Sequence, residues 1–174
     1  MRGIPRYHPL RKLFLSLIHR DLPRAGVHDA AVLGYVSDLM VRVSHMDNLF
    51  RIKTAQGKRI YTLGEMLAEA EKRTGKGDIY SATGDCTLFL SGLFPEALPR
   101  FWNLPVEEAV RVGKRVYYTA SLLKEESIFR KLSHLFEYCV LGLSYVREDL
   151  SWLPVYEEMK RLLEGEGYQP KIIS

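Results

Sequence analysis

The sequence predicts an all-α fold: a single-domain bundle of about six helices with one small β-hairpin at about residues 49–63. Two observations lead to this fold class. Apolar residues recur at helical spacing through most of the chain, and they alternate at strand spacing only around residues 49–63. A chain of 174 residues can bury a sizeable core without disulfides or metals. We therefore expect one helical domain over residues 1–174, with its core at about residues 6–150.

Residues 78–94 predict the central helix of the bundle. At about 100° per residue, their apolar side chains cover most of the helix circumference, which is typical of a helix packed on all sides. Asp85 lies inside this stretch, directly after Gly84. A carboxylate at such a place has to be paired, hydrogen-bonded or protonated.

Amphipathic patterns and capping residues predict the remaining elements. A short helix begins at Pro9, and further helices cover about residues 29–46, 63–72, 105–123, 127–150 and 153–164. Asp38 and Arg42 have the spacing of an ion pair on one helix face. Gly113 interrupts the apolar stripe of the helix at residues 105–123, at a propensity cost of about 1 kcal/mol. We therefore expect another helix to cross close to Gly113, with Gly84 or Gly92 of the central helix at the crossing point.

The hairpin prediction rests on alternation. Apolar and basic residues alternate in residues 49–53 and again in 59–63, and Gly57 between them can form the turn.

Composition indicates a protein without a membrane span. No run of about 18 apolar residues occurs, and the N-terminus lacks the pattern of a signal peptide; we expect a cytoplasmic protein. The net charge is +4, and residues 1–60 hold 11 Lys and Arg against 4 Asp. Arg outnumbers Lys by 15 to 10, a bias found in some thermophiles. Cys86 and Cys139 lie in apolar patterns, which predicts buried thiols.

Three parts of the chain carry a resemblance: RYHPLR at residues 6–11, GDCTLFLSGLFPE at 84–96, and FRKLS with FEYCVLGLSYV at 129–133 and 136–146. Together they resemble a family of bacterial helical proteins for which no activity is known. The resemblance spans about residues 6–150. It implies one bacterial helical domain and no catalytic residue.

Asp85, Tyr117 and His134 are the candidate ligand-binding residues. An enzyme of this class would hold a small molecule in a pocket near Asp85. The alternative is a structural partner for Asp85, such as an arginine, and we favour it because structural ion pairs also bury carboxylates. We expect no metal and no cofactor. His134 and Glu137 occur once and in the reverse of the order that carboxylate metal sites use, and the chain has no phosphate loop, nucleophile elbow or zinc motif.

Arg51, Lys53, Lys58 and Arg59 are the candidate nucleic-acid contacts. Basic side chains on a hairpin beside two helices suit phosphate groups. The alternative is a solvated edge that lysine and arginine protect from strand pairing, and we favour this alternative.

Tyr138, Leu141 and Tyr145 are the candidate interface residues. They form a second face on the helix at residues 127–150, away from its core stripe. This face either binds a second copy or another protein, or is covered by a terminal helix of the same chain. Tyrosine is common at interfaces. We therefore predict a non-catalytic interaction or regulatory protein of the bacterial cytoplasm, with nucleic-acid binding or a pocket enzyme as the alternatives.

Overall fold

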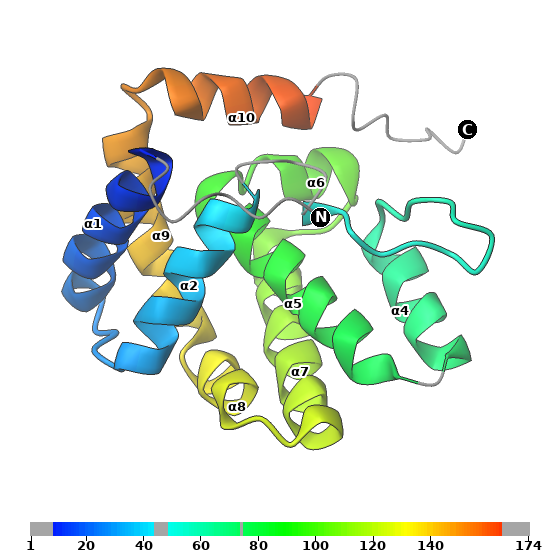
Figure 1. Cartoon of the computed structure of the whole chain (residues 1–174). Helices are drawn as coiled ribbons and strands as arrows, with labels where there is room; N and C mark the ends of the chain where they lie inside the picture. The colour runs from blue at the N-terminus through cyan, green and yellow to red at the C-terminus, as the bar shows by residue number, and fades with distance from the viewer. Residues whose placement is uncertain (1–8, 44–48, 74, 165–174) are drawn as a thin grey trace.

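The structure, a computed structural model, describes residues 9–43, 49–73 and 75–164 and is mostly helical there (Figure 1). Its elements are α1 (Pro9–Arg24), α2 (Ala30–Val43), α4 (Leu63–Lys72), α5 (Lys76–Leu93), α6 (Ala97–Phe101), α7 (Val106–Lys124), α8 (Ser127–His134), α9 (Phe136–Leu150) and α10 (Pro154–Glu164). This confirms the all-α prediction. No helix in these ranges is long and apolar enough to cross a membrane.

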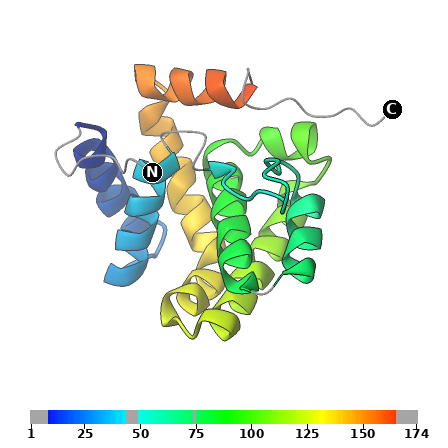
Figure 2. The ribbon, with the colours of Figure 1, turned by 45° about the vertical axis from the view of Figure 1, so that its right-hand side comes forward.

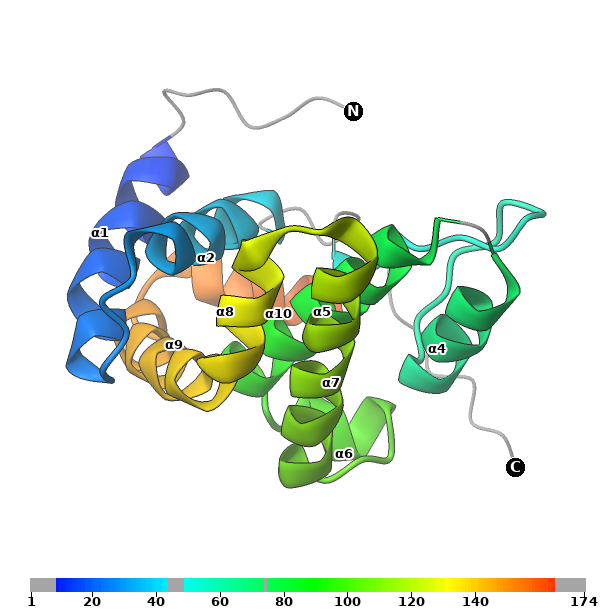
Figure 3. The same cartoon turned by 90° about the horizontal axis from the view of Figure 1, so that it is seen from below.

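The central helix is α5. Every residue from Ser81 to Leu93 is buried, because α7 packs along it, α9 packs on a second side and α4 on a third. Seen from below, α1, α2 and α9 lie on one side of α5 and α7, and α4 lies on the other (Figure 3). The prediction of a helix buried around its circumference is therefore confirmed.

Glycines allow this close packing. Side chains of neighbouring helices occupy the space that a Cβ would need: Tyr117 at Gly84, Leu143 at Gly92 and Phe136 at Gly113. The expectation that Gly113 faces the glycines of α5 is therefore wrong. Gly113 leaves room for an aromatic ring from α9 instead.

The predicted helix at residues 127–150 is two helices. Leu135, with φ −98° and ψ 9°, separates α8 from α9, and its backbone N–H donates to the carbonyl of Lys131. The helix after the break places the Phe136 ring against Gly113. This break and α6 add two helices to the seven helical stretches that the sequence pattern indicates, so the described residues hold nine helices instead of about six.

The predicted β-hairpin is also wrong. The described residues contain no strand, and the segment shows a single antiparallel bridge between Lys53 and Arg59, closed by a turn at Gly57 with φ +83°. The alternation instead reflects burial, because Ile52 and Ile60 point into the core. A two-stranded hairpin alone is only marginally stable in water, and here core packing fixes the segment instead.

The terminal helices close two sides of the bundle. The helix predicted to begin at Pro9 is α1, which extends to Arg24 and packs on α9, where Leu22 lies against Gly142. α10 crosses one end of the molecule (Figure 2). There Tyr156 stacks on Phe94, which follows α5, with ring centroids 5.2 Å apart.

Candidate functional site

Asp85 is buried in the middle of α5 and accepts hydrogen bonds from two tyrosines. Its exposed fraction is 3%. The hydroxyl of Tyr35 donates to Oδ1 over 2.6 Å, and the hydroxyl of Tyr117 donates to the same oxygen over 2.7 Å. Tyr117 belongs to α7, and its ring lies in the space beside Gly84. The small residue before Asp85 therefore lets the phenol reach the carboxylate.

Two arginines hold the other carboxylate oxygen. Arg51 donates to Oδ2 over 3.3 Å, and a guanidinium nitrogen of Arg42 lies 3.6 Å from Oδ2. Tyr35 and Arg42 are seven residues apart on α2, so two helical turns bring them to one face. The Arg42 guanidinium also lies 5.7 Å from the centre of the Tyr35 ring. Asp85 thus joins α2, the segment after it, α5 and α7.

The surroundings of Asp85 keep the tyrosines neutral. Burial and then the negative charge of Asp85 raise the pKa of Tyr35 and of Tyr117 well above the ordinary value of a phenol. Burial lowers the pKa of Arg42, but the charge of Asp85 and the neighbouring tyrosines together raise it above its ordinary value. One buried carboxylate therefore meets two neutral donors and two cations.

This arrangement suits a structural anchor better than a general base. A general base needs a carboxylate oxygen that can reach the proton of a substrate, and here each oxygen already has two partners. The buried cysteine next to it is equally unsuited to nucleophilic chemistry, since burial raises the pKa of the Cys86 thiol and disfavours its thiolate. Burial likewise raises the pKa of Cys139 to about 12.

The structure brings together two of the three candidate ligand-binding residues. Asp85 and Tyr117 are in contact, whereas His134 is exposed at the end of α8. Sequence reasoning missed Tyr35 and Arg42. The predicted pairing of Asp38 with Arg42 is wrong, because Arg42 contacts Asp85 and Asp38 pairs with Arg11 at 3.5 Å.

The candidate nucleic-acid residues do not form one exposed basic edge. Arg51 is turned towards Asp85, and its side chain is 31% exposed. Lys53 and Arg59 form the backbone bridge, and Lys58 is exposed at the turn. His45, Met46 and Asp47, which the sequence pattern placed at a helix end, lie outside the described residues. Within the described ranges, no group of three or more His, Cys, Asp or Glu side chains is arranged to hold a metal ion.

The candidate interface residues lie on the outer face of α9, defined here as Tyr138, Leu141 and Tyr145. Tyr138 is 53% exposed and Leu141 44%. Tyr145 is half-buried, since the guanidinium of Arg24 lies 4.7 Å from its ring centre. Trp152 follows Tyr145 at a spacing of seven residues and is 89% exposed. Trp152 lies in the turn between α9 and α10, and sequence reasoning missed it.

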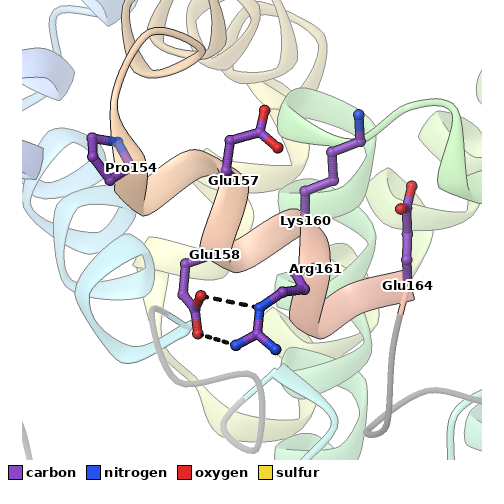
Figure 4. Close-up of a pocket in the computed structure, with 6 residues that line it drawn as sticks. All are labelled: Pro154, Glu157, Glu158, Lys160, Arg161 and Glu164. Carbon is purple, nitrogen blue, oxygen red and sulfur yellow. Dashed lines mark hydrogen bonds and ion pairs between the residues drawn. The ribbon is translucent and has the colours of Figure 1, made fainter.

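A hollow of about 450 Å³ lies along α10 (Figure 4). Its lining side chains all belong to that one helix: Pro154, Glu157, Glu158, Lys160, Arg161 and Glu164. Figure 4 shows them spread along α10, with Arg161 paired to Glu158 at 2.6 Å. The hollow therefore presents an ordinary charged helix surface.

Comparison of the chain with models of protein families, with curated proteins and with solved structures finds no match in any of the three. The resemblance to bacterial helical proteins therefore stays a prediction, as does the function.

Proposed function

We propose that this is a non-catalytic interaction protein of the bacterial cytoplasm that self-associates through the outer face of α9. One observation carries the proposal: Tyr138 and Leu141 lie side by side at helical spacing and are about half exposed. The buried residues of the same helix lie on its other side: Phe136, Cys139, Gly142, Leu143, Val146 and Leu150. Exposed aromatic and aliphatic side chains that adjoin one another favour an interface.

The terminal helices of the chain leave this face open. α10 buries Tyr156 and Met159 at the opposite end of α9, with Tyr156 on Phe94. Arg24 of α1 contacts Tyr145, and Gly26, which follows α1, lies close to the Tyr138 ring. Tyr138 and Leu141 nevertheless stay 53% and 44% exposed. The alternative that α10 covers the face therefore receives no support.

A second copy of this chain is the proposed occupant. Twofold homodimers are the commonest soluble oligomers, and one patch serves both subunits in them. Neighbouring charges of both signs suit such a self-complementary contact, since Glu137 beside Tyr138 is paired with Lys114 of α7 at 2.8 Å. The carboxylate thus remains neutralised when the patch is covered.

Light scattering after size exclusion tests the proposal. At about 100 µM, where even a Kd of about 10 µM gives mostly dimer, we expect the wild-type chain to have the mass of a dimer. The double variant Tyr138→Glu, Leu141→Glu should be monomeric with unchanged helicity. Leu122→Glu, at a side chain of α7 that is 60% exposed, is the matched control and should remain dimeric. A monomeric wild-type chain contradicts the proposal.

A further inference from the structure

A second surface feature lies on the other side of the molecule, between the segment after α2 and the start of α5. It is a hollow of about 420 Å³ with cationic side chains at its rim, Arg51, Lys53 and Arg73, and with Ile52, Ile79 and Ala82 in its lining. These residues come from three parts of the chain, so their convergence is a product of the fold. Its volume is within the usual range for small-molecule sites.

The charge of the hollow favours an anion. Three of the lining side chains are cations and one, Asp78, is a carboxylate whose charge is balanced by the ammonium of Lys124 at 2.6 Å. Two of the cations, Arg51 and Arg73, are paired with carboxylates outside the lining. Lys53 is exposed, and no carboxylate of the described residues pairs with its ammonium. A ligand with a negative charge therefore meets the ammonium of Lys53, which no described carboxylate balances, and the remaining N–H donors of the two arginines.

Carboxylates outside the lining of the hollow hold Arg51 and Arg73 in position. Asp85 fixes the Arg51 guanidinium at 3.3 Å, and Glu69 fixes the Nε of Arg73 at 2.7 Å. Arg73 also donates to the backbone carbonyl of Lys53, which ties α4 to the rim. A guanidinium has five N–H donors, and these contacts use one on Arg51 and two on Arg73. Positioned arginines with remaining donors suit phosphate recognition.

The floor of the hollow restricts the ligand further. Ile52 and Ile79 are each only 7% exposed, and Ala82 only 3%. An aliphatic floor gives no hydrogen bonds and suits an apolar or planar group. We propose that the hollow binds a small phosphorylated organic molecule, with its phosphate between Arg51, Lys53 and Arg73 and its apolar part over Ile52 and Ile79.

Titration calorimetry with inorganic phosphate and adenosine 5′-monophosphate as probes tests this proposal. Both probes should bind to the full chain with a Kd of about 1 mM or lower, and the adenosine probe should bind more tightly than inorganic phosphate because of its base. Lys53→Glu should weaken both by about tenfold or more through charge repulsion. Lys12→Glu, the same charge change at an exposed lysine of α1, should leave both affinities unchanged.

Three results would overturn the proposal. The first is no heat of binding for either probe up to about 10 mM. The second is equal weakening by Lys53→Glu and Lys12→Glu, which would indicate unspecific attraction. The third is binding of a single-stranded oligonucleotide much more tightly than of the mononucleotide, with Lys58→Glu as harmful as Lys53→Glu. That third result would favour a nucleic-acid surface instead.

Discussion

Two tyrosine hydroxyls share one oxygen of the Asp85 carboxylate, and two guanidinium groups face the other. A hydrogen bond to a charged acceptor contributes about 1.5–3 kcal/mol. The hydrogen bond from Tyr117 should contribute more to stability than the one from Tyr35, because the Tyr117 side chain is fully buried whereas Tyr35 is only half-buried. The residues around Asp85 therefore stabilise the protein unequally.

Tyr117→Phe should destabilise the protein by about 2 kcal/mol at neutral pH, and this difference should shrink in alkali. Burial and Asp85 raise the pKa of Tyr117 in the folded chain above the value of about 10 that it has when unfolded. The stability that the neutral hydroxyl contributes is thus complete below about pH 10 and is lost as pH rises towards the folded pKa.

Denaturant unfolding between about pH 10 and 11 measures this effect. The wild-type free energy of unfolding should fall more steeply than that of Tyr117→Phe, by about 1.4 kcal/mol per pH unit. Tyr118→Phe, at the exposed neighbouring tyrosine, is the control. Parallel curves for wild type and Tyr117→Phe would rule out this role for Tyr117.

At the scale of elements, Arg20 of α1 pairs with two carboxylates, Asp21 of α1 and Asp149 of α9. Asp21 is fully buried, and its Oδ2 has no hydrogen-bond partner among the described residues, while Oδ1 accepts from Arg20 and Arg24. Burial, and then the neighbouring Asp149 of α9, raises the pKa of Asp21, while the same contact lowers the pKa of Asp149. A proton on Asp21 would allow it to donate to Asp149.

Asp21→Asn should therefore gain stability relative to wild type as pH rises from about 4 to 7. The raised pKa of Asp21 means that its contribution is present below the unfolded value of about 4 and is lost as pH rises through the folded value. An asparagine amide can donate to Asp149 at every pH in this range. Chemical denaturation across the range, with Asp38→Asn as the exposed control, gives the comparison. A constant difference between Asp21→Asn and wild type would refute this account.

The sequence predicted the elements whose evidence is local. The central helix follows from apolar residues around its whole circumference, and its burial is confirmed from Ser81 to Leu93. The break at Leu135 could not be predicted, because helix-forming residues continue through it and the decisive contact, Phe136 on Gly113, is tertiary. The alternation around Ile52 and Ile60 led to a wrong prediction of strand pairing, because it reflects the burial of these two side chains.

The candidate site was predicted only in part, because some of its residues have local sequence evidence and others are brought in by tertiary packing. Asp85 was found because a carboxylate inside an apolar helix requires a partner. Its arginine partners could not be identified from the sequence, since Arg42 has a nearer acidic residue at helical spacing in Asp38. Tyr35 had the pattern of an ordinary core residue. Only the packing of α2 and α7 against α5 brings these side chains to one carboxylate.

At the scale of the whole molecule, Asp85 is the point where four separate segments meet. α2, the segment containing Arg51, α5 and α7 each contribute a side chain, so the carboxylate links the basic N-terminal part of the chain to the core bundle. The same Arg51 lines the 420 Å³ hollow. If Asp85 is a structural anchor, its removal leaves two arginines and two tyrosine hydroxyls without their acceptor, and the whole domain loses stability.

The free energy of unfolding of Asp85→Ala, measured by denaturant titration beside wild type, tests this claim most directly. Removal of one partner from a buried ion pair costs about 3–5 kcal/mol, so we expect a loss of at least about 3 kcal/mol or a chain that does not fold. Asp38→Ala, at an aspartate whose side chain is 63% exposed, should change the stability by less than about 1 kcal/mol. An Asp85→Ala variant as stable as wild type would contradict the structural role of Asp85.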